Sequence, residues 1–445
     1  MDLEGFTKRR LIKGIAEEDI LEELDKLVKE FKNWSSNKRQ NFSRALYQEV
    51  TTSLEYKKLK NPFIKTLLDY PKSGVAMGEF GVGSRGEGDF FVHKKISEII
   101  GNIDVIVGPK DQDDAGVVEC SGDYVTLALD GTHSRLSDFP FLAGFHAARA
   151  ALRDVCVMGS NPVAMMSDLH LADDGDIGKL FDFTGGVSCI GDLTNVPLVS
   201  GSTLRVGGDM VFGDRLVSGV AAVGVSNTFP KVRRNAENGD IILLTKGSGG
   251  GTITTIAIYN KYFEIIKETL NVEFTDACYT LFKNGIGAIH TMCDITNGGI
   301  RGDASEISRT SGKKFLLNED ALLEAINKKV LDMLIELEID PLGISTDSLM
   351  LILPEENVSN ICKYLKKVTK IYEVGHIEEG NGVMTLGKKE KELKTLFRES
   401  PYTKVKQVVG QIGPKNIENK KNKLENSRLK TLAKKREVSN YIRRS

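Results

Sequence analysis

The sequence of 445 residues is poor in the features that mark membrane-spanning, secreted or metal-finger proteins. It contains no run of about 18 apolar residues, the length that a membrane-spanning helix needs. Its start, MDLEGFTKRRLIKGIAEED, is charged throughout and lacks the apolar core of a signal peptide. The six cysteines are scattered with no C-x-x-C pair, so neither a disulfide framework nor a zinc finger is indicated. We therefore expect a cytoplasmic protein that does not bind membranes.

An excess of charge of one sign is missing as well. The formal net charge is −1, so the molecule as a whole has no strong electrostatic attraction to nucleic acid. Only the segment 415–445 departs from this balance, with eleven Lys and Arg against three Glu. Such a run is most often a solvated or disordered tail. A contact with an acidic partner surface or RNA, and a docking helix, are the alternatives for this segment.

Several catalytic signatures are also absent. The chain has no G-x-S-x-G nucleophile elbow, and none of the V-A-I-K, H-R-D and D-F-G elements of protein kinases. The stretch 81–89, GVGSRGEGD, fits G-x-G-x-x-G, but the preceding SGVAMGEF is a poor strand. Asp104 has roughly the spacing of a ribose-binding acid, yet it begins a strand instead of ending one. These absences argue against a dinucleotide-binding fold and against a protein kinase.

Composition and periodicity divide the rest of the chain. The expected parts are a helical N-terminal extension (1–74), an N-terminal α/β domain (75–230), a C-terminal α/β domain (231–405) and a basic tail (406–445). In the extension, Ile20, Leu24 and Val28 recur at helical spacing. The polar stretch 227–240 has neither helical nor strand periodicity and is interpreted as the connection between the two domains.

Within the two domains, individual elements are indicated by apolar runs. YVTLALD (124–130) predicts a buried strand that ends in an acid, and IILLT (241–245) and SLMLILP (348–354) predict further strands. The segment 141–158 predicts a helix with one apolar stripe, and Asp154 lies on the side opposite that stripe.

Aspartates at the ends of expected elements are the strongest chemical signal. They are Asp113, Asp114, Asp130, Asp154, Asp209 and Asp294. Gathering carboxylates is costly unless a positive group lies among them, and Mg²⁺, which binds oxygen ligands and shares them with nucleotide phosphates, is the natural candidate. The alternative for any one Asp is that it caps a turn or a helix.

Glycine-rich turns before helices are the second signal. TKGSGGGT and ITNGGIRG each have the form of a glycine turn that opens a helix, where backbone N–H groups can hold an anion. The first is not a Walker A loop, because Lys246 precedes its glycines. Lys246 or Arg85 is the candidate cation for phosphates, with a solvated side chain as the alternative. His133 lies just past Asp130 and is expected near the site.

The order of these motifs resembles a known family. DDAGVV, TLALDGTHSR, AGFHAARAALRDVCVMG, SGST…GGD, GDRLVSGVAAVGV, GDIILLTKGSGGG and CDITNGGIRGDASEI follow one another between about residues 80 and 400. This series is similar to the aminoimidazole-ribonucleotide synthetase (PurM-like) superfamily, in particular to its synthetase-related branch. Thiamine-monophosphate kinase, selenophosphate synthetase and the hydrogenase maturation dehydratase are kin.

The resemblance implies a fold and a set of ligands. It implies an α/β (α+β) protein of two domains, whose N-terminal domain forms a β-barrel with that of a second subunit, and whose C-terminal α/β domain packs beside it. It implies a homodimer that binds ATP with Mg²⁺. The implied metal ligands are Asp114, Asp130, Asp154 and Asp294, and the glycine-rich segment 81–88 matches the loop that closes over the phosphates.

Motifs and resemblance together yield the expected site. The candidate catalytic residues are Asp114, Asp154 and Lys246. The expected ATP contacts are Gly81, Gly83, Arg85, Gly86, Gly88, Asp89, Asp113, Gly131, His133, Gly208, Asp209, Gly298 and Gly299.

Departures from the family members limit the functional prediction. The glycine-rich loop has no cysteine, unlike selenophosphate synthetases, and the chain ends IRRS without the reactive cysteine of the dehydratase. The GTHSR element resembles G-x-H-F of thiamine-monophosphate kinase but lacks the Phe. We therefore expect an ATP- and Mg²⁺-dependent phosphotransferase or synthetase acting on a small metabolite. The alternative is an ATP-binding regulatory or assembly protein that holds a partner through its basic tail.

Overall fold

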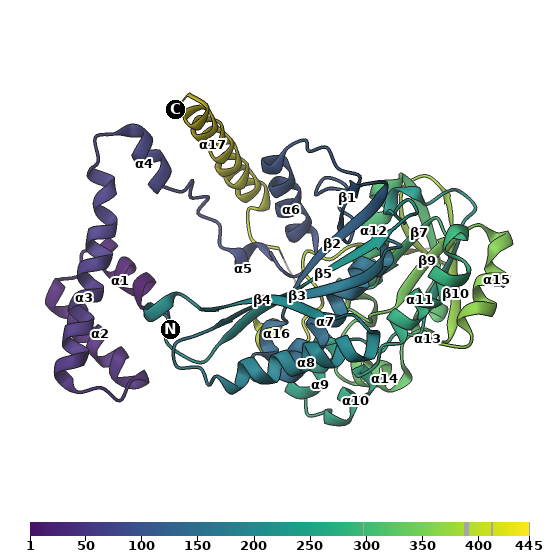
Figure 1. Ribbon diagram of the computed structural model, residues 1–445, viewed down its shortest axis with the longest axis horizontal. Coiled ribbons are helices and arrows are strands. Elements are labelled where there is room, and N and C mark those ends of the chain that lie inside the picture. The colour runs from purple at the N-terminus through teal and green to yellow at the C-terminus, as the bar shows by residue number, and fades with distance from the viewer. Residues whose placement is uncertain (297, 387–390, 411–412, 445) are drawn as a thin grey trace.

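Two β-sheets with their helices form the body of the protein. The computed structural model describes residues 1–296, 298–386, 391–410 and 413–444. A group of helices at the N-terminus stands apart from the body, and the long C-terminal helix starts beside α6 (Glu87–Ile100) and projects outward from the body (Figure 1). Most strand pairs in both sheets are antiparallel, so the fold is of the mixed α/β (α+β) class that the sequence predicts. None of the helices in these ranges is long and apolar enough to cross a membrane.

The N-terminal segment is helical, as its periodicity predicts. Its helices are α1 (Leu3–Ile12), α2 (Glu17–Phe31), α3 (Ser36–Leu54) and α4 (Pro62–Leu68). Ile20, Leu24 and Val28 lie on one face of α2 and are fully buried in a small cluster that also contains Phe212 of the body. The ammonium group of Lys32 lies 2.5 Å from Asp173, which adds an ion pair to this contact. An apolar stripe and a partly buried ion pair thus attach the helices to the body.

The first sheet belongs to the N-terminal half. Its strands, in spatial order, are β1 (Gly116–Cys120), β2 (Asp123–Gly131), β5 (Leu216–Ser226), β3 (Asn161–Leu171) and β4 (Leu198–Arg205). Helices α7 (Pro140–Val157) and α8 (Gly178–Thr194) contribute to the core on one face. On β2, Leu127 and Leu129 are 48% and 73% exposed, so the prediction of a fully buried strand there is wrong. Strand alternation buries Thr126 and Ala128 and leaves the other face open in a single chain.

Within the described residues, the second sheet has seven strands. They are, in spatial order, β12 (Lys391–Glu392), β11 (Gly382–Leu386), β8 (Lys313–Asn318), β10 (Ile371–Glu379), β6 (Ile241–Thr245), β9 (Leu349–Leu353) and β7 (Thr291–Asp294). Helix α12 (Gly299–Ser311) contributes to the hydrophobic core on one face of this sheet. Helices α11 (Glu273–Asn284) and α15 (Glu355–Leu365) contribute to the core on the other face. Because both faces are covered, β9 is buried at every position, and the strands predicted at 241–245 and 348–354 are confirmed.

Helix α7 joins the two halves of the body. Leu152 and Val155 pack against the first sheet, whereas Cys156 and Val157 belong to the core cluster of the second sheet. The helix expected at 141–158 is therefore confirmed, but it is buried on most of its surface instead of along a single stripe. The helix therefore places Asp154 between the two domains.

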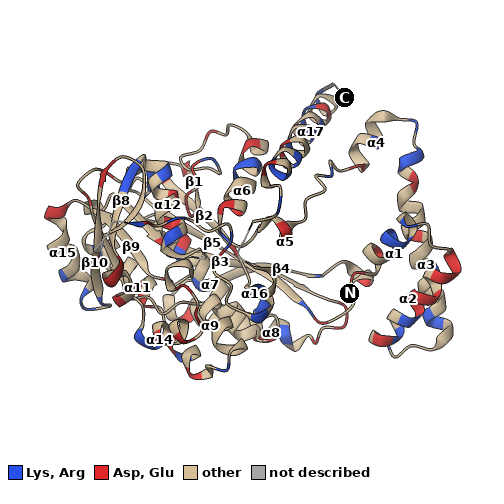
Figure 2. Cartoon of the chain, turned by 180° about the vertical axis from the view of Figure 1, so that it is seen from behind, with Lys and Arg blue, Asp and Glu red and all other residues tan. Residues whose placement is uncertain are grey.

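The C-terminal segment is a helix and not a disordered tail. Helix α17 (Ile417–Arg444) packs on α6 (Glu87–Ile100) through the ion pairs Lys95–Glu425 and Arg428–Glu98, each at 3.0 Å. Figure 2 shows basic residues along the length of α17, and two of them, Arg428 and Lys435, contact α6 through Glu98 and the carbonyl of Ile99. The expectation of a solvated tail is wrong because half-buried residues such as Leu424 recur at helical spacing among the charges.

Short helices complete the structure. They are α5 (Met77–Phe80), α9 (Gly251–Tyr259), α10 (Ile266–Thr269), α13 (Glu319–Glu324), α14 (Lys328–Glu336) and α16 (Lys404–Val409). Of these, α9 begins at the glycines of TKGSGGGT, as the sequence predicts for a glycine turn that opens a helix.

Candidate active site

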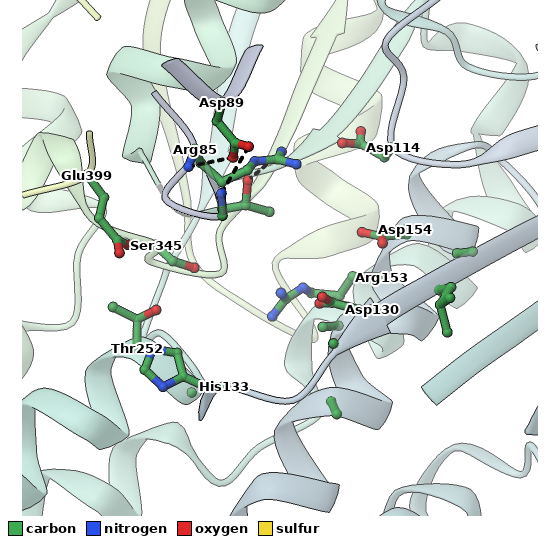
Figure 3. Close-up of a pocket in the computed structure, with 18 of the residues that line it drawn as sticks. Arg85, Asp89, Asp114, Asp130, His133, Arg153, Asp154, Thr252, Ser345 and Glu399 are labelled. Atoms are coloured by element: carbon green, nitrogen blue, oxygen red, sulfur yellow. Dashed lines mark hydrogen bonds between the residues drawn. The ribbon is translucent and has the colours of Figure 1, made fainter. Parts of the chain in front are cut away.

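A cavity of about 920 Å³ lies where the two domains meet. Its walls are the end of β2, one side of α7, the glycine-rich segment 81–89 with α6, and residues 399–406 near the C-terminus. Figure 3 shows Asp114, Asp130 and Asp154 on one side of this cavity, and Glu399, Thr252 and His133 on the opposite side. Charged and polar side chains from distant parts of the chain thus converge on one space.

Three of the predicted aspartates, Asp114, Asp130 and Asp154, line this cavity, and Asp294 lies buried next to them. Asp130 ends β2, Asp154 lies on α7, Asp114 precedes β1, and Asp294 ends β7. Potential ligand atoms of Asp114, Cys293 and Asp294 all lie within 4.8 Å of one another. Burial raises the pKa of Asp154 well above its usual range, and the carboxylates of Asp294 and Asp130 raise it further. The structure therefore brings these four carboxyl groups close to one another.

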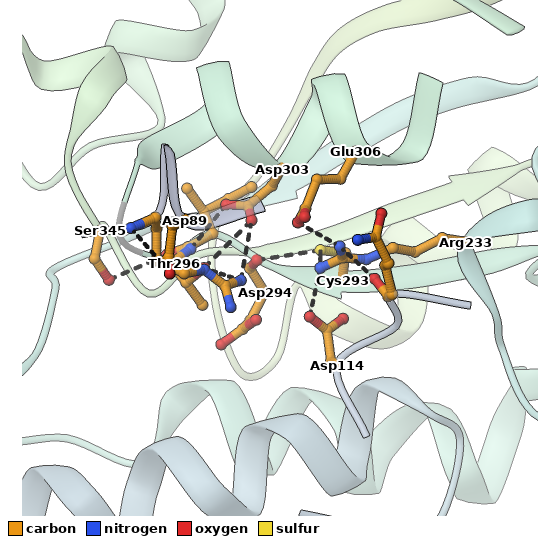
Figure 4. Close-up of polar contacts among 12 residues, drawn as sticks. Asp89, Asp114, Arg233, Cys293, Asp294, Thr296, Asp303, Glu306 and Ser345 are labelled. Atoms are coloured by element: carbon orange, nitrogen blue, oxygen red, sulfur yellow. Dashed lines mark hydrogen bonds and ion pairs between the residues drawn. The ribbon is translucent and has the colours of Figure 1, made fainter. Parts of the chain in front are cut away.

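Two buried arginines partly neutralise the group. The guanidinium of Arg233 donates to Asp114 at 2.5 Å and to Glu306 at 2.6 Å (Figure 4). Arg153 donates through Nε to Asp294 at 3.0 Å and also pairs with Asp347. Sequence reasoning missed both arginines. Arg153 could have been found as a charge beside Asp154 in a buried helix, whereas Arg233 stands in the polar stretch interpreted as a connection.

The arginines leave part of the acidic group unsatisfied. Within the described ranges, Asp114 Oδ2 and Asp294 Oδ1 are buried and have no hydrogen-bond partner. A buried carboxylate oxygen without a partner carries a large desolvation penalty, so such atoms indicate a cation. Carboxylate oxygens are the ligands that a hard divalent cation prefers. The residues present therefore fit Mg²⁺.

The glycine-rich segment lies beside the acids. We call this segment, residues 81–89, the lid. The carboxylate of Asp89 accepts the backbone N–H groups of Gly83 at 3.0 Å and Arg85 at 2.8 Å. Arg85 has a φ of 45°, unusual for a residue with a side chain, and its guanidinium donates to Thr296 at 2.9 Å. Asp89 and Thr296 thus hold Arg85 in a backbone conformation that turns the lid toward the second domain.

The lid glycines serve packing as well as the cavity. Gly83, Arg85 and Asp89 line the cavity. Gly81, Gly86 and Gly88, by contrast, lie against residues 396–398 and the carbonyl of residue 80. A Cβ on Gly88 would lie 2.1 Å from that carbonyl oxygen, so no larger residue fits there without a shift. These three glycines position the lid instead of facing the cavity.

Some of the other predicted site residues line the cavity and others do not. Asp113, Gly131 and His133 line the cavity. Gly298 and Gly299 open α12; a Cβ on Gly298 would lie 2.4 Å from the carbonyl oxygen of Arg85, so this glycine supports the lid. The remaining three residues, Lys246, Gly208 and Asp209, are not brought to the cavity.

Those three residues have other surroundings. Lys246 lines a separate small pocket together with Glu273 and Asp347. Gly208 and Asp209 form a short 3₁₀ turn beyond the end of β4, where the side chain of Asp209 is 72% exposed and pairs with Arg205. The alternative considered for an isolated aspartate, a local role in a turn, fits Asp209.

His133 is neutral at this site. Burial lowers its pKa to about 4, and the nearby cations Lys406 and Arg135 act in the same direction. One ring nitrogen shares a 2.7 Å hydrogen bond with Tyr402, and the other a 3.0 Å hydrogen bond with Thr255. Sequence reasoning did not identify the C-terminal residues Glu399, Tyr402 and Lys406, which lie outside every motif used above.

Comparison with known proteins agrees with this architecture. The model for AIR synthase related protein, N-terminal domain, matches residues 112–226, and that for its C-terminal domain matches residues 237–387. An uncharacterised protein of Methanocaldococcus jannaschii is 53% identical over 430 residues, which are 95% of this chain and 94% of that protein. Selenide, water dikinase of Pseudomonas straminea is 26% identical over 218 residues, or 46% of this chain and 57% of that enzyme.

Solved structures share the fold at low identity. The hydrogenase maturation protein HypE in complex with ATP has a TM-score of 0.53 and 18% identity, covering 73% of this chain and 98% of HypE. AaThiL complexed with AMPPCP and TMP has a TM-score of 0.52 and 19% identity, covering 68% and 94%. Since the two family models together match more than half of the chain, it belongs to the AIR synthase related protein family of the PurM-like superfamily.

Proposed function

We propose that this protein is an ATP- and Mg²⁺-dependent phosphotransferase or synthetase that activates a small metabolite by phosphoryl transfer. The observation that carries this proposal is a pair of buried carboxylate oxygens without a hydrogen-bond partner among the described residues. One belongs to Asp114, which lines the large cavity beside the glycine lid, and the other to the neighbouring Asp294. The likeness to selenide, water dikinase, and to folds solved with ATP and with AMPPCP, supports the same kind of chemistry.

The chain's residues divide the work in this proposal. Asp114 and Asp294, with Asp130 and Asp154, would hold Mg²⁺, which neutralises charge on the phosphates of ATP. Arg85 and the lid backbone would contact the phosphates, and Asp89 would keep the lid in place through the two N–H groups that it accepts. Phosphoryl transfer asks mainly for such positioning and charge neutralisation.

The structure bears on two predictions from the sequence: which cation contacts the phosphates, and what the basic C-terminal segment does. Lys246 lies in a different pocket, so Arg85 is the better placed cation for the phosphates. Within α17, the ammonium groups of Lys434 and Lys435 donate to backbone carbonyls of residues 67–69 and 99–100. These two ammonium groups bind carbonyls of the same chain instead of facing a partner protein or RNA. We therefore favour a phosphotransferase or synthetase over an assembly protein that holds a partner through its basic tail.

A homodimer is part of the proposal. Apolar side chains are exposed on three strands of the first sheet, with Leu129 73%, Val199 60% and Val217 53% exposed. Apolar area of this extent on a sheet marks a surface that another chain covers. We propose that a second copy packs here and that the protein acts in the cytoplasm.

Nucleotide binding tests the proposal. Titration of the purified protein with ATP, with Mg²⁺ and with excess EDTA, should show binding that depends on the metal. Asp114→Asn should abolish it, because one ligand oxygen and one negative charge are lost. Asp209→Asn, an exposed aspartate outside the cavity, is the matched control and should bind as the wild type does. Equal affinity of the Asp114→Asn variant and the wild type contradicts the site assignment.

A further inference from the structure

A C-terminal segment beyond both family models forms one wall of the cavity. The models end at residue 387, whereas Glu399, Tyr402 and Lys406 line the cavity. Figure 3 places Glu399 beside Ser345, across the cavity from Asp114 and Asp154. If phosphates bind at the acids, this wall faces the part of the cavity that is left for the acceptor molecule.

Glu399 has an unsatisfied oxygen in this wall. Its side chain is only 3% exposed, and Oε1 accepts a hydrogen bond from Lys406. In the described residues Oε2 is buried without a hydrogen-bond partner. The backbone N–H of Glu399 donates to the carbonyl of Ser84 in the lid at 2.9 Å, which fixes the residue relative to the lid. Buried polar atoms in native proteins nearly always have a hydrogen-bond partner. The unpartnered Oε2 is therefore not explained by the ion pair with Lys406 alone.

The surroundings of Glu399 suit proton transfer. The titratable groups that face it are the ammonium of Lys406, the carboxylate of Asp89 and the phenol of Tyr402. Burial raises the pKa of Glu399 and Asp89 adds to this, while Lys406 opposes both. A carboxylate whose pKa is moved toward the working pH is a more effective general base than an ordinary one.

We propose that Glu399 is the general base of the transfer reaction and that the acceptor carries an alcohol or a primary amine. This assignment rests on the proposed ATP site. The carboxylate of Glu399, which lines the cavity, accepts the proton of the acceptor while the acceptor oxygen or nitrogen forms a bond to the γ-phosphorus of ATP. The bond from that phosphorus to the β,γ-bridging oxygen breaks, its electron pair leaves with ADP, and the proton stays on Glu399 until solvent removes it.

The test compares Glu399→Gln with the wild type in the full-length chain. ADP release is measured with Mg–ATP in water alone and with a panel of small alcohols and amines, and Mg–ATP affinity is measured separately. We expect Glu399→Gln to bind Mg–ATP within about twofold of the wild type and to release ADP at least about 100-fold more slowly. Lys404→Gln, an exposed lysine on the same helix as Lys406, is the control and should leave both values unchanged.

A second variant separates a base from a structural ion pair. Lys406→Gln removes the cation that lowers the pKa of Glu399, so the acidic limb of the rate–pH profile should move to higher pH. If Glu399→Gln does not fold, Glu399→Asp keeps the charge but withdraws it by one methylene, and should slow ADP release at least about tenfold.

Each contrary result has its own meaning. Unchanged ADP release in Glu399→Gln, or an unmoved pH profile in Lys406→Gln, overturns the base assignment and leaves the ATP site standing. A wild type that binds Mg–ATP but releases no ADP with water or any panel member overturns it too. A wild type that binds no Mg–ATP refutes the proposed function itself.

Discussion

Replacing Arg233 by Met should strongly destabilise the protein. The side chain of Arg233 is 2% exposed, and its partners Asp114 and Glu306 are 3% and 7% exposed. The variant keeps most of the volume but leaves two carboxylates buried near each other without their cation. Removing one partner of a buried ion pair costs about 3–5 kcal/mol, and we expect a loss of this size in the free energy of unfolding. Urea denaturation followed by circular dichroism measures it.

The adjacent Arg234 offers a matched control. Its side chain is 39% exposed and pairs at 2.8 Å with Asp111, which is 32% exposed, so Arg234→Met should cost about 1 kcal/mol or less. The Arg233→Met deficit should also shrink at low pH. Burial already raises the pKa of Asp114 in the folded state, and loss of the guanidinium raises it further, so stability returns as pH falls and Asp114 becomes neutral. Equal losses in the two variants would refute the buried network.

Three further outcomes follow from packing, exposure and titration. Gly88→Ala forces a Cβ to 2.1 Å from the carbonyl oxygen of residue 80, so the lid should exchange its amide hydrogens faster than in Gly78→Ala, where a Cβ meets open space. Leu129→Asp on the exposed face of β2 should convert a dimer to monomers in light-scattering chromatography, and an unchanged mass would place the interface elsewhere. Because the folded-state pKa of His133 is depressed to about 4, its contribution to stability is present above about pH 6.5 and is lost as pH falls toward 4. His133→Gln should therefore melt with a weaker pH dependence over this range, as scanning fluorimetry would show.

Local patterns predicted much of the fold. Residues 241–245 form a strand because an apolar run of this length suits a strand covered on both faces, and α7 appears where a long apolar segment indicated a helix. The prediction for the tail was wrong because charge dominates its composition. Its packing depends on the carbonyl of Ile99 and the carboxylate of Glu98 in α6, which lie more than 300 residues away in sequence.

Some residues of the candidate site could be predicted from the sequence and others could not. Asp114, Asp130, Asp154 and Asp294 could be predicted because each stands at the end of an element whose type the sequence shows. Arg233 and Glu399 could not, because their importance arises from contacts across the domains: with Asp114 in one case and with the lid in the other. The exposure of Leu129 is likewise a property of the single chain's open sheet, which periodicity does not reveal.

The most direct test of the central claim is a crystal structure with Mg²⁺ and a non-hydrolysable ATP analogue. We expect a metal ion at about 2.1 Å from Asp114 Oδ2 and Asp294 Oδ1, which have no hydrogen-bond partner among the described residues, with phosphates beside Arg85. A nucleotide bound away from these acids, or bound here with both oxygens still unligated, would contradict it.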